Sequence, residues 1–250
     1  MGEAWWRVAG RDLLGLLLPV GCAGCGADDV PWCDRCARAL AGPAWRADAE
    51  AGRLDVLDGR SLLPVWAVAD FTGPVRRAVS AWKDHGRADL TPVLGAAARR
   101  AARAVLAEAG AALASPRPVL VVPAPSTPAA RRARGWDPAG ALAAAVAEEL
   151  SRHGVAARRA PLLRRGAGAD QAGLSARARS RNLAGQVRAR PPRRATSGPV
   201  VLVDDVLTTG ATFAACVRAL AAVGIGAAAG VVVAATPVPG ATRSSPAPPF

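Results

Sequence analysis

The sequence contains no tyrosine and a single lysine, Lys83, against 31 arginines. A preference for arginine this strong is most simply explained by a coding bias. The formal net charge of +13 can therefore reflect drift as well as an electrostatic footprint for nucleic acid or phosphate. The two histidines, His85 and His153, lie in polar, turn-like contexts, where surface positions are expected.

Long hydrophobic runs are also missing. The apolar run near the start, Leu13–Val20, is interrupted by a glycine and a proline and falls far short of the roughly 20 residues that span a bilayer. Arg7 and Arg11 precede this run, so a signal peptide, or a lipoprotein cleaved before Cys22, is the alternative to a cytoplasmic chain. Pro19 stands where a lipoprotein site requires an aliphatic residue, and such cleavage would break up a group of four cysteines. We therefore expect a cytoplasmic protein without membrane insertion.

Four of the five cysteines form two close pairs. Cys22 and Cys25 make one CxxC pair, Cys33 and Cys36 make a second, and seven residues separate the pairs. Two such turns can present four thiolates to one tetrahedral Zn²⁺ ion, and a site with four protein ligands has a structural role. The pattern predicts a structural zinc site in a reducing compartment, with two disulfides or a redox-active pair as alternatives. Cys216 stands alone and is expected to be a small buried apolar residue.

The hydrophobic pattern divides the chain into three parts, with no internal repeat. Residues 1–60 hold a short apolar helix, the cysteine module and a polar linker over 43–60. Residues 61–236 alternate between apolar strands and helices, and residues 237–250 form a Pro- and Ser-rich tail that is expected to be disordered. The alternation predicts an α/β domain with a parallel sheet and helices on both faces. The expected strands are 62–69, 119–122, 200–203 and 230–235, and the expected helices are 76–83, 91–114, 137–151 and 212–223.

The excess positive charge is concentrated in the middle of the chain. Residues 131–194 hold 15 arginines and four acidic residues. Within this region, residues 160–198 show little periodicity, and a loop of that length in a compact domain is usually functional or disordered. The segment is either a basic face that meets phosphate or nucleic acid, or an ordinary solvated surface.

The strongest local signal is the stretch VVLVDDVLTTGATF over residues 200–213. An apolar strand leads to two acids, a turn of small residues follows, and then a helix begins. Ligands of open α/β sheets bind at the carboxyl ends of strands, and a helix N-terminus offers free N–H groups to an anion. A glycine in the turn allows successive N–H groups to point inward. The sequence therefore predicts a phosphate site formed by Thr208, Thr209, Gly210, Ala211 and Thr212.

Asp204 and Asp205 have a different role, because carboxylates aimed at a phosphate would repel it. Directed a few ångströms away, they can accept hydrogen bonds from two vicinal hydroxyls, and one can help to hold Mg²⁺ directly or through water. A phosphate at one end and a diol at the other describe a ligand that contains ribose 5-phosphate.

The order of strand, two acids, short spacer and TTGxT closely resembles the phosphoribosyl pyrophosphate (PRPP) loop of type I phosphoribosyltransferases. Over about residues 17–235 the chain is similar to the ComF/GntX family of ComFC-like proteins. The elements that carry this resemblance, besides the loop at Asp204, are Leu18-Pro19 before the double CxxC, FTGPVRRAVSAWKDHG at 71–86, VVPAP at 121–125, Arg134-Gly135-Trp136, and Gln171-x2-Leu174-x4-Arg179-x2-Asn182.

The resemblance implies a type I phosphoribosyltransferase fold, a parallel sheet flanked by helices with a small hood, together with a small N-terminal zinc-ribbon-like module. It also implies a cytoplasmic bacterial protein linked to DNA uptake in competent cells. It is compatible with an enzyme that transfers phosphoribosyl to an undefined acceptor and releases pyrophosphate. The chain departs from the family on the acceptor side: Asp137 and Pro138 replace the usual Asn and Gln, and Gly168 stands where Thr is usual.

Site roles follow from the charge of PRPP. The expected catalytic residues are Asp204, Asp205 and Lys83. The alternative for Lys83 is that this lysine has been retained by chance and has no role in the site. Mg²⁺ would offset the pyrophosphate charge. A loop of backbone donors for the pyrophosphate is expected at Pro123, Ala124, Pro125 and Ser126. Candidates for a lid over the site, unless the basic segment is a plain linker, are Arg134, Gln171, Arg179 and Asn182.

Two classes of function remain open at this stage. The first is a PRPP-dependent transferase. The second is a binding module that senses PRPP or a nucleotide and acts through single-stranded DNA or a DNA-uptake protein. Seven tryptophans and the basic segment support the second class, because exposed indoles stack on bases while arginines contact phosphates.

Overall fold

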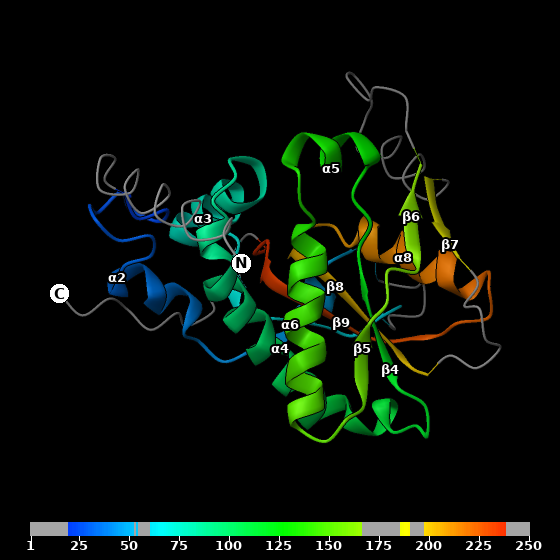
Figure 1. The fold of residues 1–250 in the computed structure, drawn as a ribbon. Helices are drawn as coiled ribbons and strands as arrows, with labels where there is room; N and C mark the ends of the chain where they lie inside the picture. Colours follow the sequence, from blue (N-terminus) through cyan, green and yellow to red (C-terminus); the bar gives the residue numbers. More distant parts are fainter. Residues whose placement is uncertain (1–19, 53, 55–60, 167–185, 191–197, 239–250) are drawn as a thin grey trace, which may run out of the picture.

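The computed structural model describes residues 20–52, 54, 61–166, 186–190 and 198–238. The chain forms an α/β structure around one mostly parallel sheet (Figure 1). Its strands lie in the order β1-β2-β9-β8-β4-β5, with β3 paired to β9, and among them only β1 and β2 pair antiparallel. The strands are β1 (Trp45–Arg46), β2 (Val65–Ala67), β3 (Ala69–Asp70), β4 (Val119–Pro123), β5 (Ala157–Arg159), β8 (Val200–Leu207) and β9 (Ala227–Ala235).

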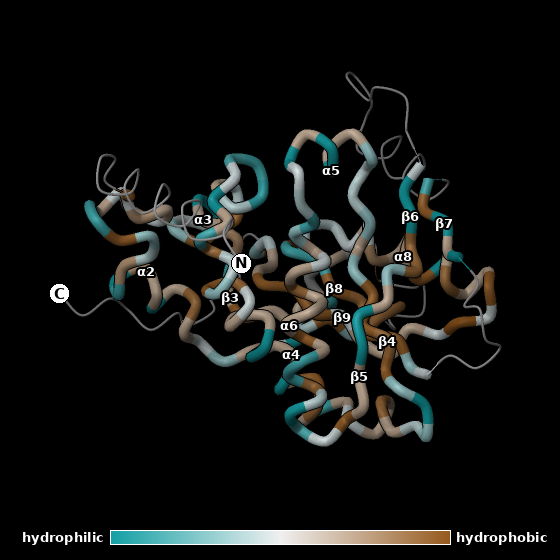
Figure 2. Tube along the Cα trace, viewed as in Figure 1, coloured by the Kyte–Doolittle hydropathy of each residue, from teal (hydrophilic) through white to brown (hydrophobic). Residues whose placement is uncertain are grey.

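Helices cover both faces of the sheet, as the alternating sequence pattern predicts. Helices α4 and α6 pack on one face, and α8 lies on the other beside an antiparallel pair of strands, β6 and β7 (Figure 1). Figure 2 shows the apolar residues of the central strands enclosed between these layers. The elements are α2 (Asp34–Ala37), α3 (Gly73–Asp84), α4 (Thr91–Leu113), α5 (Pro128–Arg134), α6 (Pro138–Arg152), β6 (Leu163–Arg165), β7 (Val187–Ala189) and α8 (Ala211–Ala221), with 3₁₀ turns at Arg38–Leu40, Asp48–Glu50 and Ala88–Leu90.

The helix starts partly follow the sequence signals. Asp137 is the N-cap of α6, and its carboxylate accepts a hydrogen bond from the Gly140 N–H at 3.1 Å. Thr91 before Pro92 is a sequence pattern that predicts Thr91 as the N-cap of α4, but the helix begins at Thr91 itself and Leu90 is the N-cap. The Thr91 hydroxyl is occupied instead by the Trp82 indole N–H, which donates to it at 2.9 Å. A tertiary contact therefore replaced the local cap.

Strands β8 and β9 extend beyond their predicted limits. The sequence predicts that the first ends at Val203, but pairing with β9 continues through Asp204 opposite Val232 to Leu207 opposite Ala235. The two acids are therefore part of the strand and do not follow it. Helix α8 correspondingly begins at Ala211, one residue before the predicted start. The parallel ladder with β9 stabilises these polar residues in a strand that their own preferences would end.

Part of the region predicted as a linker over 43–60 packs on the core. Trp45–Arg46 pairs with β2, and Asp48 is buried, where its carboxylate accepts hydrogen bonds from Arg46 at 2.7 Å and from the Val65 N–H at 3.0 Å. Ala51 and Leu54 are also fully buried. The polar sequence of this region predicts exposure. Asp48 is buried instead, because Arg46 of β1 and Val65 of β2 supply its hydrogen bonds.

The short strands β5, β6 and β7 and the helix α5 were also missed. Each is three to seven residues long and arginine-rich, so hydrophobic periodicity could not reveal it. Of residues 1–20, where a short apolar helix is predicted, the structure describes only Val20, and nearly all of the predicted tail over 237–250 lies outside the described residues. Among the helices that the structure describes, not one has the length and apolar character required to cross a membrane.

Candidate functional site

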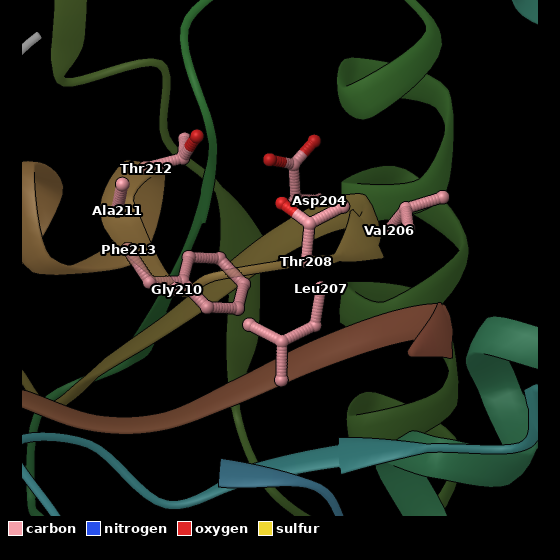
Figure 3. Close-up of a pocket in the computed structure, with 8 residues that line it drawn as sticks. All are labelled: Asp204, Val206, Leu207, Thr208, Gly210, Ala211, Thr212 and Phe213. Atoms are coloured by element: carbon pink, nitrogen blue, oxygen red, sulfur yellow. The ribbon is translucent and has the colours of Figure 1, made fainter. Parts of the chain in front are cut away.

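The carboxyl end of β8 and the turn into α8 form the candidate site. In Figure 3 the side chains of Asp204, Thr208 and Thr212 point to one side of the chain, while Leu207 and Phe213 point to the other. The first three border a cleft of about 420 Å³ that lies between the end of β8 and helix α3. The polar residues that line this cleft are Arg76, Ser80, Lys83, Asp84, Asp204, Asp205, Thr208 and Thr212. The strand and turn predicted to bind a sugar phosphate therefore meet α3 at one cavity.

Lys83 and Asp205 form an ion pair in this cleft. The Lys83 Nζ lies 2.6 Å from Oδ2 of Asp205, whose side chain is 5% exposed, while the Lys83 side chain is 35% exposed. The Asp205 Oδ1 accepts a hydrogen bond from the Val206 N–H at 3.0 Å. The fold thus brings the only lysine of the chain to the predicted acids.

The neighbouring Asp204 is half-buried, and its carboxyl group forms no ion pair with any residue that the structure describes. Burial raises the pKa of Asp204 well above its ordinary value, and repulsion from Asp205 raises it further. Burial acts to lower the pKa of Lys83, but the charges of Asp205 and Asp204 outweigh it, so this pKa is raised. The site therefore combines a charged ammonium with two close carboxyl groups that resist carrying two full negative charges.

The turn after β8 has the backbone geometry expected of an anion site. Gly210 is the N-cap of α8 with φ 78° and ψ 0°, a left-handed conformation, and no side chain caps the helix there. The first N–H groups of any helix lack acceptors within the helix. A Cβ atom on Gly210 would lie 2.7 Å from the Leu54 side chain, so the turn tolerates only glycine. Thr208 and Thr212 add hydroxyl donors beside these N–H groups.

The predicted pyrophosphate loop lies at the end of β4, next to β8. Pro123 pairs with Val203, and the Ala124 N–H donates to the Val203 carbonyl at 2.8 Å. Pro123 and Pro125 have no backbone N–H, and the N–H of Ala124 is already hydrogen-bonded. Ser126 is therefore the residue of this loop that can donate both its backbone N–H and its hydroxyl to a ligand. The loop lies beside β8, but none of its four residues is among those that line the cleft, and it offers fewer backbone donors than the sequence suggested.

Of the four predicted lid residues, the structure describes one. Arg134 ends α5, and its Nη1 atom is buried without a hydrogen-bond partner among the described residues. Its charge is close enough to Lys83 to oppose the protonation of that side chain. Gln171, Arg179 and Asn182 lie outside the described residues.

Sequence reasoning did not select Asp84, although it follows Lys83 directly. It lines the acid cleft and also a second cavity beside α5. Asp84 lies in the FTGPVRRAVSAWKDHG stretch that resembles the ComF family, and this position was the sequence signal that could have identified it as a site residue. Cys216, which was expected to be a buried apolar residue, is fully buried in α8 and has a pKa that burial raises, in agreement with that prediction.

The four N-terminal cysteines form one cluster. The Sγ atoms of Cys22, Cys25, Cys33 and Cys36 all lie within 4.8 Å of one another, and none of these four cysteines forms a disulfide bond. The Sγ atoms of Cys25 and Cys33 are 3.6 Å apart. A tetrahedral zinc with Zn–S near 2.3 Å separates its sulfurs by roughly 3.8 Å. The cluster therefore has the geometry to hold a zinc ion.

The charges around the cluster also fit a cation. The Arg35 guanidinium beside Cys25 lowers the pKa of that thiol to about 6. Burial and the three neighbouring sulfurs raise the pKa of Cys36, because a further thiolate would be repelled by its neighbours. A divalent ion removes this conflict, since it binds the deprotonated form of every ligand.

The cysteine module contacts the helix that carries Lys83. The Arg77 Nε of α3 donates to the Gly24 carbonyl at 2.5 Å, and Arg87 donates to the Gly21 carbonyl at 3.1 Å. A Cβ atom on Gly24 would lie 2.6 Å from the Cys36 sulfur and 2.9 Å from Pro74 of α3. The cysteine cluster and the acid cleft thus share α3 as a common support.

No protein-family model matches the chain, and no curated protein is significantly similar to it. The assignment of function therefore depends on the residues and geometry described above.

Replacing Lys83 with methionine is expected to lower the free energy of unfolding by about 1–3 kcal/mol, because it leaves the buried Asp205 carboxylate without its cation. The partial exposure of Lys83 keeps this value below that of a fully buried pair. Denaturant unfolding measures the change. Adding Asp205→Asn to Lys83→Met is expected to restore most of the loss, and a double variant no more stable than Lys83→Met would show that the ion pair does not stabilise the fold.

Proposed function

We propose that this chain binds PRPP at the carboxyl end of β8 and belongs to the type I phosphoribosyltransferase-like proteins of the ComF family. The observation that carries the proposal is the placement of two carboxyl groups and a phosphate-type turn at the two ends of one short stretch, with Lys83 beside them. The helix N-terminus at Gly210 would take the 5-phosphate. Asp204 and Asp205 would accept hydrogen bonds from the two ribose hydroxyls.

The raised pKa of Asp204 supports a ligand that donates hydrogen bonds. Hydroxyl donors stabilise an ionised carboxylate, so a bound diol would lower the raised pKa of Asp204 toward its ordinary range. Lys83 would hold the Asp205 carboxyl group in position through the 2.6 Å contact. The acids are in this way prepared for a diol, and a second anion at that end would be repelled.

Mg²⁺ is part of the same proposal. Carboxylate oxygens are the ligands that this ion prefers, and Asp204, which borders the cleft and has no described cation beside it at contact distance, is the better placed of the two acids. The ion would offset the charge of the departing pyrophosphate. Ser126 and the end of α5 are the described groups that would lie on the pyrophosphate side.

The broader role that we propose follows from the resemblance to ComF proteins, namely a part in DNA uptake, with phosphoribosyl transfer to an acceptor as the activity. The alternative is a module that binds PRPP or a nucleotide without catalysis and acts through single-stranded DNA or a protein partner. Exposed arginines on α5, Arg131 and Arg132, are the described residues that favour a nucleic-acid surface.

Calorimetric titration of PRPP with Mg²⁺ into the zinc-loaded protein tests the proposal. We expect saturable binding that weakens at least about 100-fold in the double variant Asp204→Asn, Asp205→Asn, since two charge-assisted hydrogen bonds contribute about 1.5–3 kcal/mol each. Asp89→Asn is the matched control, because this exposed acid pairs with Arg87 outside the cleft.

Equal PRPP affinity in the parent and the double variant would refute the assignment of the two acids. A folded parent that binds no PRPP would refute the proposed function altogether. Binding of single-stranded DNA that falls steeply with salt and is indifferent to Asp204→Asn would instead identify a separate nucleic-acid surface.

A further inference from the structure

A second cavity adjoins the acid cleft. It has a volume of about 450 Å³ and lies between the C-terminal end of α3 and helix α5, which stand on the same side of the sheet (Figure 1). Its walls are Asp84, His85, Gly86, Arg134 and Trp136, with two alanines of α5. A volume of this size is typical of small-molecule sites. Asp84 lines both this cavity and the acid cleft, so this residue borders both spaces.

The cavity is lined by an arginine, Arg134, that has a guanidinium nitrogen without an acceptor among the described residues. The Nη1 atom of Arg134 is buried and donates no hydrogen bond within the described chain. A buried guanidinium nitrogen left without an acceptor costs free energy. Because the Arg134 side chain also lines the cavity, an anionic ligand group bound there would supply its guanidinium with an acceptor. A carboxylate is the usual planar partner of a guanidinium.

The cavity also contains a positioned aromatic ring. The Trp136 ring lies edge-to-face with Trp82, with centroids 4.9 Å apart and planes at 81°. Trp82 is itself fully buried and is held by its hydrogen bond to Thr91. Trp136 is only partly buried, so it presents a fixed apolar surface to the cavity. A flat ligand ring would stack there at little entropic cost.

We propose that this cavity holds the acceptor of phosphoribosyl transfer, and that the acceptor is a planar aromatic acid with a nucleophilic nitrogen. Arg134 binds its carboxylate, Trp136 stacks on its ring, and Asp84 accepts a hydrogen bond from its nitrogen at the boundary with the acid cleft. This inference rests on the proposed function for the identity of the transferred group, whereas the binding site itself does not depend on it.

The position of Asp84 assigns it a role in the transfer. The nitrogen lone pair forms the new bond to C1 of the ribose, the bond from C1 to the pyrophosphate oxygen breaks, and its electron pair leaves with the pyrophosphate. The proton that the nitrogen loses passes to the Asp84 carboxylate. Atoms and charges balance without any further reactant.

Binding of 4-aminobenzoate, with aniline and benzoate as partial probes, tests the site. Calorimetry is performed on the zinc-loaded protein with and without saturating ribose 5-phosphate and Mg²⁺. Arg134→Gln is expected to weaken 4-aminobenzoate about 10- to 100-fold and to leave aniline unchanged. Trp136→Leu is expected to weaken all three probes about tenfold. Asp84→Ala is expected to remove the advantage of 4-aminobenzoate over benzoate.

Arg131→Gln is the matched control for Arg134→Gln, because it removes the same charge from an exposed position of α5 that does not line this cavity. It is expected to leave the affinity for 4-aminobenzoate within about twofold of the parent, whereas an equal loss in both variants would show only a general charge effect and overturn the site. Thermal unfolding of each variant shows that the comparison is between folded proteins.

The outcomes separate this inference from the proposed function. A parent that binds ribose 5-phosphate but no 4-aminobenzoate under either condition overturns the acceptor site and leaves the proposed function intact. If Arg134→Gln weakens PRPP but not 4-aminobenzoate, Arg134 belongs to the pyrophosphate and the inference is also wrong. Binding of 4-aminobenzoate that depends on Arg134 and survives Asp204→Asn with Asp205→Asn supports the site even where PRPP fails to bind.

Discussion

Replacing Gly210 with alanine is expected to lower the free energy of unfolding by about 2–4 kcal/mol and to abolish binding of ribose 5-phosphate. Two costs add at this position. The left-handed backbone, with φ 78°, disfavours any residue with a Cβ atom. That Cβ atom would also lie 2.7 Å from Leu54 and 3.2 Å from Ala51. Relief of either contact moves the turn whose N–H groups are proposed to bind the phosphate.

Gly224→Ala is the matched control for this effect. Gly224 also has a positive φ, 73°, but a Cβ atom there would meet nothing within 4 Å. Its substitution should cost only the backbone term, about 1 kcal/mol, and leave ligand binding unchanged. Denaturant unfolding and titration of ribose 5-phosphate into both variants give the comparison. Equal losses of stability, or binding retained in Gly210→Ala, would show that the turn does not depend on close packing against Leu54.

Removing the metal from the cysteine cluster is expected to lower the melting temperature by about 10 °C or more, because a structural zinc site of four thiolates contributes many kilocalories per mole to folding. The effect should extend to the acid cleft. Without the metal, Arg77 and Arg87 lose the ordered carbonyl groups of Gly24 and Gly21 that hold them, and α3 carries Lys83. We therefore expect weaker ribose 5-phosphate binding in the metal-free protein.

Cysteine variants provide the controls. Cys36→Ala should reduce zinc content from one ion per chain to near zero and reproduce the effect of a chelator. Cys216→Ala removes a fully buried cysteine outside the cluster and should keep the zinc. Zinc content and thermal unfolding are measured on the same preparations. Undiminished zinc in Cys36→Ala, or a melting temperature unaffected by chelation, would show that the cluster is not a structural metal site.

Much of the central fold could be predicted because its signals are local. The strand Val119–Pro123 and the part of β8 before Asp204 are buried on both faces, so they appear in the sequence as continuous hydrophobic runs. Helix α6 was visible from its N-cap Asp137 and its helical pattern. The strands β5, β6 and β7 had no such signal, because three arginine-rich residues become a strand only when a neighbour supplies the hydrogen bonds.

The sequence by itself determined the groups whose geometry depends on near neighbours in the chain. The double CxxC turns place four sulfurs together, and Gly210 after the acids of β8 sets the conformation of the turn. Only the tertiary structure decided which distant residues meet them. The pairing of Lys83 with Asp205 and the shared position of Asp84 depend on how α3 packs beside β8. Such packing is set by the burial of many side chains at once, so no local pattern of residues encodes it.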